Sequence, residues 1–108
     1  LKTAIGEKEV LSPSEYDEQT SELYELWDVT LNEVWGVLKR LLDDETMNAL
    51  TEEEREWIIW KEAEIRKTEE EHGNDTMQSA IVNLRAAELT EKRVDDLLII
   101  LESVKRQS

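Results

Sequence analysis

The sequence predicts an all-α protein built from three long antiparallel helices in an up-down-up bundle. Apolar residues recur in steps of three and four along most of the chain, and no stretch shows the strict alternation of a half-buried strand. Only three glycines and one proline interrupt its 108 residues. Short turns then favour antiparallel packing of consecutive helices, and helices this long are also compatible with a dimer that buries the remaining apolar edges.

Residues 1–11 show no sustained period and contain Gly6, so we expect a flexible N-terminal arm there. Residues 12–108 are expected to form a single helical domain. A chain of this length fits one domain and is long enough to bury a core without metal or disulfide support.

The first helix is expected to start at Ser12, with Pro13 at its first position and Glu15 completing a capping box. It should run for roughly 28–30 residues, or about 45 Å at ~1.5 Å per residue. Gly36 lies inside this helix, where it either permits a close contact or marks a bend. The apolar face comprises Tyr16, Thr20, Leu23, Trp27, Leu31, Val34, Leu38 and Leu41.

The second helix has two candidate starting points. Asp43-Asp44 offers a break with an N-cap, and Thr51 with Glu54 also matches a capping box. The helix should end at His72-Gly73, where Gly73 suits the left-handed residue that follows many helices. Its inner face comprises Met47, Leu50, Trp57, Ile58, Lys61 and Ile65.

A capping signal formed by Asp75 and Gln78 introduces the third helix. Its apolar positions are Met77, Ala80, Ile81, Leu84, Ala87, Val94, Leu97, Leu98, Leu101 and Val104. Together the three segments account for the all-α prediction.

The charge of the chain limits its partners. It has 27 acidic and 13 basic residues, a formal net charge of −14. Such acidity argues against binding to nucleic acid or to anionic membrane surfaces, and it favours a basic protein partner. No apolar run approaches the ~18–20 residues of a membrane span, so we expect no membrane insertion of this segment.

The acidity is concentrated on the first helix, because no basic residue occurs between Lys8 and Lys39. One interpretation is a docking surface for a cationic partner, and the other is a solvated face that keeps the protein soluble. Trp60, at the edge of the second helix's inner face, is either an interface anchor or an ordinary boundary residue. The candidate partner-binding residues are Glu18, Glu22, Glu25, Asp28 and Trp60.

No pattern of residues indicates catalysis. The absence of cysteine excludes thiol catalysis and Cys-ligated metals, and the chain has no Gly-rich phosphate loop, nucleophile elbow or HExxH motif. The one histidine, His72, fits a favourable interaction with a helix C-terminus better than metal coordination. We therefore expect neither an enzyme nor a cofactor.

Lys61 lies close to the inner face of the second helix. Because burying a lone ammonium group is costly, we expect it to have an aromatic, carboxylate or carbonyl partner.

Several short motifs occur together in the chain. Leu31-Asn32-Glu33-Val34-Trp35 looks like an LN-x-x-Y/W stretch, and Leu89-Thr90-Glu91-Lys92-Arg93 followed by Leu97 looks like L-T-x-x-R-x-x-x-L. Between them, residues 50–62 match L-x-x-x-Q-R-x-W-I-x-Y-R-D with conservative changes. The combination resembles the lysozyme-inhibitor LprI-like family. The residues that match its motifs and that we expect to be mainly structural are Arg55, Trp57, Lys61, Glu62, Gly73, Thr76 and Arg93.

The resemblance implies a helical bacterial protein that is secreted or lipid-anchored, with any signal segment outside this chain. It also implies inhibition of lysozyme. Many members carry two cysteines, whose places are held here by Ile65 and Arg85, so we expect a cysteine-free variant without a cross-link between helices. The structural residues are expected to tie the second and third helices together near the Gly73 turn.

These observations favour an extracytoplasmic binding domain without catalysis. Its acidic helix face is expected to engage a basic glycan hydrolase such as lysozyme and block its cleft. The alternative is a structural or interaction module of the cell envelope with an unknown partner, and cation binding by the acidic surface is a third interpretation.

Overall fold

The computed structural model describes residues 11–107 and contains three α-helices: α2 (Pro13–Leu41), α3 (Asp44–Glu71) and α4 (Gln78–Gln107). No strand occurs within this described range, and the all-α prediction is confirmed. Of the arm expected at residues 1–11, all but Leu11 lie outside the described residues.

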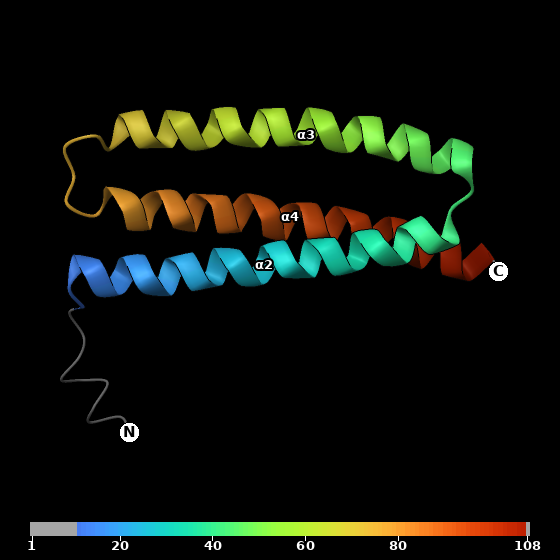
Figure 1. Cartoon of the computed structure of the whole chain (residues 1–108), viewed down its shortest axis with the longest axis horizontal. Helices are drawn as coiled ribbons and strands as arrows, with labels where there is room; N and C mark the ends of the chain where they lie inside the picture. Colours follow the sequence, from blue (N-terminus) through green and yellow to red (C-terminus); the bar gives the residue numbers. More distant parts are fainter. Residues whose placement is uncertain (1–10, 108) are drawn as a thin grey trace, which may run out of the picture.

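The helices follow the expected up-down-up order (Figure 1). In this view α4 lies between α3 and α2, and the α2–α3 and α3–α4 connections sit at opposite ends of the molecule. The most extensive packing joins α2 and α4, which run in the same direction, while α3 contacts α4 less closely. The fold is therefore a tight α2–α4 pair with α3 laid against it.

The starts of α2 and α3 follow from their capping residues. The Ser12 hydroxyl accepts from the Glu15 amide at 3.1 Å, and the Glu15 carboxylate accepts from the Ser12 amide at 2.9 Å, which completes the predicted capping box. At the next helix Asp43 accepts from the Thr46 amide at 2.8 Å, and hydrogen bonds from the side chain and backbone of Thr46 hold the pKa of Asp43 below its usual value. The first of the two predicted starts for α3 is correct.

The alternative start at Thr51 is wrong. Thr51 lies inside α3, and its hydroxyl donates to the backbone carbonyl of Met47 at 2.8 Å instead of capping a helix. This back-bonding is a common use of threonine within helices.

The predicted left-handed conformation of Gly73 is also wrong, because no residue from 11 to 107 has a positive φ. The chain leaves α3 through two successive turns, in which the Asp75 amide bonds to His72 and the Gln78 amide bonds to Asp75. The Asp75 carboxylate accepts from the Met77 amide at 2.8 Å, as a cap would. The Gln78 side chain bonds instead to the carbonyl of Glu69, so the second half of the predicted box is absent.

The buried core lies mostly between α2 and α4. Its members are Leu31, Val34, Leu38, Leu50, Val94 and Leu97. Of these only Leu50 comes from α3, and it is the one residue of α3 classed as buried. The partly buried side chains around the core include Trp27, Trp35 and Trp57. Apolar burial therefore stabilises the contact between α2 and α4, and it contributes much less to holding α3 in place.

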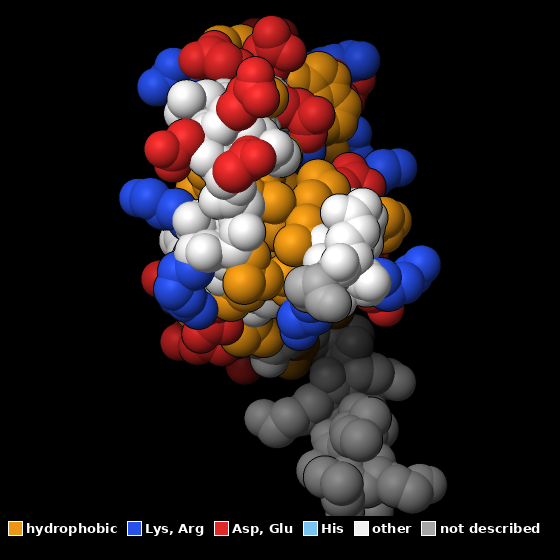
Figure 2. Space-filling model, turned by 90° about the vertical axis from the view of Figure 1, so that its right-hand side faces the viewer, with side chains coloured by type: hydrophobic (Ala, Val, Ile, Leu, Met, Phe, Trp, Pro, Cys, Tyr) orange, Lys and Arg blue, Asp and Glu red, His pale blue; other side chains and the backbone are white. Residues whose placement is uncertain are grey.

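One end of the molecule exposes apolar surface. Figure 2 views the end that carries the α2–α3 connection, and hydrophobic side chains appear there between the helix ends, with acidic side chains above them on α3. An open depression at this connection is lined in part by Trp35, Leu42 and Met47.

We expect Gly36→Ala to raise the free energy of unfolding by about 0.5–1 kcal/mol, since glycine in a helix interior costs about this much relative to alanine. An added Cβ would meet only the Arg40 guanidinium, at 4.0 Å. Urea denaturation measures the change. In the control Gly73→Ala, the Cβ would lie 3.6 Å from the Glu70 carbonyl, and stability should change by less than about 0.5 kcal/mol. A loss of stability in Gly36→Ala would show that Gly36 serves a close contact.

Candidate functional site

The acidic face of α2 consists of Glu18, Glu22, Glu25 and Asp28, which are all exposed. They follow one another in steps of four, three and three, so their side chains project from neighbouring positions on the helix surface. None of them forms an ion pair with any residue between 11 and 107. The four carboxylates thus remain available to a partner.

Two apolar side chains lie among these carboxylates. Leu26 is 61% exposed and Val29 is 53% exposed, and both line a shallow depression together with Glu22, Glu25 and Asp28. Sequence reasoning missed Leu26 and Val29 because they lie off the apolar stripe of the helix. An apolar residue outside that stripe is the signal that could have found them.

Trp60 lies on α3 and is 47% exposed. All residues that line the depression on α2 belong to α2 itself. The structure therefore does not place Trp60 in the lining around Leu26 and Val29.

A buried ion-pair cluster joins α3 to α4. The side chain of Arg93 donates from Nε to Glu54 at 2.7 Å and from Nη1 to Glu53 at 3.0 Å. Its guanidinium lies 5.8 Å from the centre of the Trp57 ring. The third nitrogen, Nη2, is buried without an acceptor among the described residues. Arg93 and Glu54 are both largely removed from water, at 7% and 12% side-chain exposure.

Lys61 joins the same aromatic ring to α2. Its ammonium lies 5.1 Å from the centre of Trp57 and 5.5 Å from that of Tyr24, and it donates to the Tyr24 hydroxyl at 3.1 Å. Trp57 is one of the partners the sequence suggested for Lys61, and Tyr24 is an addition that only the tertiary structure reveals. The cation–π contacts compensate part of the lost hydration of the ammonium.

The structure brings together three of the seven family-motif residues: Trp57, Lys61 and Arg93. Arg55 is exposed and pairs with Glu52 within α3 at 2.7 Å, and Glu62 is exposed further along the same helix. Gly73 and Thr76 lie in the α3–α4 connection. The Arg93–Glu54 contact is about 25 Å along α3 from the last helical residue, at ~1.5 Å per residue, so it lies far from that connection.

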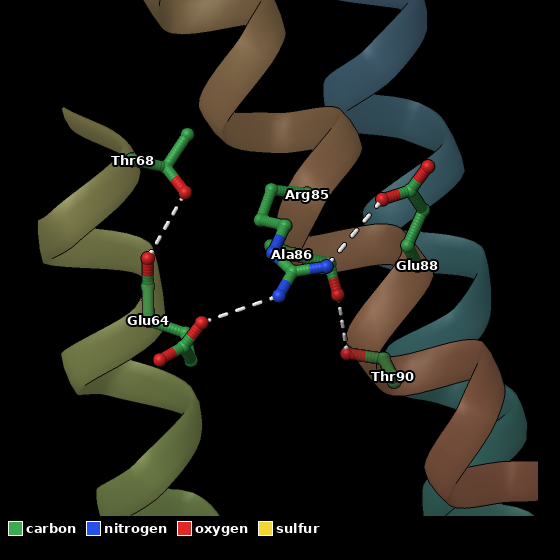
Figure 3. A network of polar contacts seen from close by, with 6 residues as sticks. All are labelled: Glu64, Thr68, Arg85, Ala86, Glu88 and Thr90. Carbon is green, nitrogen blue, oxygen red and sulfur yellow. Dashed lines mark hydrogen bonds and ion pairs between the residues drawn. The ribbon is translucent and has the colours of Figure 1, made fainter. Parts of the chain in front are cut away.

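A second ion pair between α3 and α4 lies nearer the connection (Figure 3). Arg85 reaches from α4 to Glu64 on α3 at 3.2 Å, and its other nitrogen lies 3.8 Å from Glu88 on its own helix. Arg85 and Ile65 hold the places where the family resemblance expects cysteines. At this place the ion pair between Arg85 and Glu64, the residue next to Ile65, joins α4 to α3.

A polar contact between α2 and α4 was not anticipated from the sequence. The Asp17 carboxylate accepts from the Ser79 hydroxyl and, at 3.0 Å, from the side-chain amide of Asn83. Asn83 also donates to the backbone carbonyl of Asp17 at 3.3 Å. These polar residues are adjacent only in the folded chain, so no local pattern marks them.

The described residues hold no arrangement suited to metal chemistry. Between residues 11 and 107 no group of three or more His, Cys, Asp or Glu side chains could hold a metal ion. His72 caps the C-terminal end of α3, and its Nδ1 lies 3.8 Å from the Asp75 carboxylate. No helix in this range is long and apolar enough to cross a membrane.

Comparison with known protein families gives one match. A family model described as Lysozyme inhibitor LprI matches residues 10–97. The matched range takes in α2, α3 and the part of α4 up to Leu97, and so includes the acidic face and the contacts of Arg93. No match was found among curated proteins or among solved structures.

We expect Arg93→Ala to lower the free energy of unfolding by about 3 kcal/mol, because it leaves the Glu54 carboxylate buried without its partner. Arg55→Ala is the matched control. It removes an exposed pair within one helix and should cost less than about 0.5 kcal/mol. Urea denaturation of both variants measures the difference, and equal losses would contradict the importance of the buried contact.

Proposed function

The chain belongs to the LprI family of lysozyme inhibitors, and from this membership we propose that it binds a basic glycan hydrolase such as lysozyme through the acidic face of α2. The observation that carries the proposal is the set of exposed, unpaired carboxylates of Glu18, Glu22, Glu25 and Asp28. The first and the last of these four residues are ten steps apart along the helix, or about 15 Å.

Electrostatics supports this choice of partner. A run of like charges on one helix face costs a few tenths of a kcal/mol for each neighbouring pair, and a cationic surface relieves that repulsion. Charges of this kind raise the rate of association more than they slow dissociation. Their effect falls as the Debye length shrinks from ~10 Å at 0.1 M salt to ~3 Å at 1 M.

Inhibition by this protein is proposed to be stoichiometric occlusion. LprI is an inhibitor family rather than a catalytic one, and binding across the mouth of a glycan-binding cleft requires no reactive group on the inhibitor. We assign the protein no catalytic activity and no cofactor. We place its action outside the cytoplasm, as for the LprI family, in a secreted or lipid-anchored form.

The motif residues are proposed to support the binding face rather than to form it. Arg93 holds α3 to α4, and Lys61 holds α3 to α2 through the Tyr24 hydroxyl. A rigid scaffold lowers the entropy that α2 loses on binding. We propose Trp60, which is exposed on α3 and lies outside the lining of the α2 depression, as a separate anchor for the partner.

A second candidate function is a structural or interaction module of the cell envelope, which pairs with another copy or sits in a larger assembly. The exposed apolar surface at the end of the molecule in Figure 2 favours it. Light scattering coupled to size exclusion separates the two. A dimer whose mass is independent of concentration would support this candidate, and a monomer at all concentrations would weaken it.

We expect removal of the acidic face to weaken inhibition of a cationic lysozyme by about thirtyfold in 50 mM salt. Four exposed charge pairs at about 0.5 kcal/mol each contribute about 2 kcal/mol. The test variant carries Glu18→Gln, Glu22→Gln, Glu25→Gln and Asp28→Asn. Inhibition constants from turnover assays at 50 and 300 mM salt measure the effect.

The control for this variant carries Glu69→Gln, Glu70→Gln, Asp95→Asn and Asp96→Asn, which are exposed carboxylates on α3 and α4. It has the same net charge as the test variant and should inhibit nearly as the unmodified protein does. Equally weakened inhibition in the test and control variants would show that overall net charge, and not the position of the carboxylates on α2, determines inhibition. No inhibition by the unmodified protein at low salt would refute the proposed function.

A further inference from the structure

We propose that Leu26 and Val29 form the centre of the contact on α2 and receive an apolar side chain that basic residues flank on the surface of the cationic enzyme. This inference rests on the proposed function. It assigns different tasks to two kinds of residue on one face: the apolar pair holds the partner, and the carboxylates around it attract the partner.

The geometry of α2 supports the pair as a contact centre. Leu26 and Val29 are three residues apart on one helix, so their side chains adjoin. Both remain more than half exposed in the folded chain, and the depression that they line has Glu22, Glu25 and Asp28 in its walls. An apolar centre within a polar rim is the usual anatomy of a protein–protein interface.

The charges around the pair select a cationic occupant over a second copy of this chain. A symmetric pairing through this face would set the Glu22, Glu25 and Asp28 carboxylates of one copy against those of the other. No basic residue between Lys8 and Lys39 is present to relieve the repulsion, and like charges brought together at an interface cost several kcal/mol. On a partner with Lys or Arg around an apolar side chain, the apolar side chain would contact Leu26 and Val29 and the basic residues would pair with the carboxylates.

Among residues 11–107, the two most exposed large apolar side chains outside this face, Ile59 and Ile99, lack this arrangement. Ile59 is 69% exposed on α3 and Ile99 is 66% exposed on α4, but they stand on different helices and neither is part of the α2 depression. They therefore provide matched controls for the loss of exposed apolar surface.

The experiment measures the binding kinetics of a cationic lysozyme to three immobilised forms of the full chain: unmodified, Leu26→Gln with Val29→Gln, and Ile59→Gln with Ile99→Gln. Glutamine keeps a good helix propensity and removes the apolar contact. Thermal melts followed by circular dichroism should show that the three forms fold alike, since every changed side chain is exposed.

We expect the Leu26/Val29 variant to dissociate at least about tenfold faster, while its association rate stays within about twofold, because buried contacts set dissociation and rim charges set association. The Ile59/Ile99 variant should match the unmodified chain. Binding by the unmodified chain with the same dissociation rate in both variants would overturn this inference and leave the proposed function standing. No binding by the unmodified chain at low salt would overturn both.

Discussion

The position of α3 depends on the guanidinium of Arg93. α3 contributes a single buried apolar residue, Leu50, to the core, and by apolar burial alone it would be weakly attached. Arg93 reaches across from α4 to Glu53 and Glu54 and lies against Trp57. The cost of removing the guanidinium from water is offset because the two carboxylates and the ring replace its contacts with water. Lys61 and Arg85 add further polar connections from α3 to the other two helices.

Because α3 is held mainly by polar contacts and α2 mainly by apolar packing on α4, the acidic face of α2 is not covered by another helix. α2 packs through Leu31, Val34 and Leu38 against α4, and its Asp17 carboxylate adds polar contacts by accepting from Ser79 and Asn83. Glu15 completes the cap at the start of α2, whereas Glu18, Glu22, Glu25 and Asp28 form no ion pair with any residue between 11 and 107. The proposed binding surface, with the apolar pair Leu26 and Val29 at its centre, uses these unpaired carboxylates.

The fold was largely predictable from the sequence, because helix ends are marked locally. Ser12 and Asp43 show this, since each cap acts on an amide three residues away. The errors come from places where a local signal had two uses. Thr51 matched the pattern of a helix cap, but its hydroxyl donates to the Met47 carbonyl within α3. Gly73 suited a left-handed conformation, but the α3–α4 connection contains no residue with a positive φ.

The site was only partly predictable. The acidic residues were visible as a charge run, and a partner for Lys61 was required by the cost of burying a cation. Tyr24, Glu53 and Glu54 could not be assigned as partners, because the residues they meet are 37 to 40 positions away in the chain. Leu26 and Val29 lie off the apolar stripe of α2, which is a local signal, but their exposure depends on where the neighbouring helices lie.

The central claim, that α2 presents the binding face, is tested most directly by nuclear magnetic resonance titration of the labelled chain with unlabelled cationic lysozyme at low salt. We predict that amide signals of residues 18–29 shift or broaden first, while those around Arg93 in the α3–α4 contact stay unchanged. Perturbation confined to α3 or α4, or no perturbation at all, would contradict it.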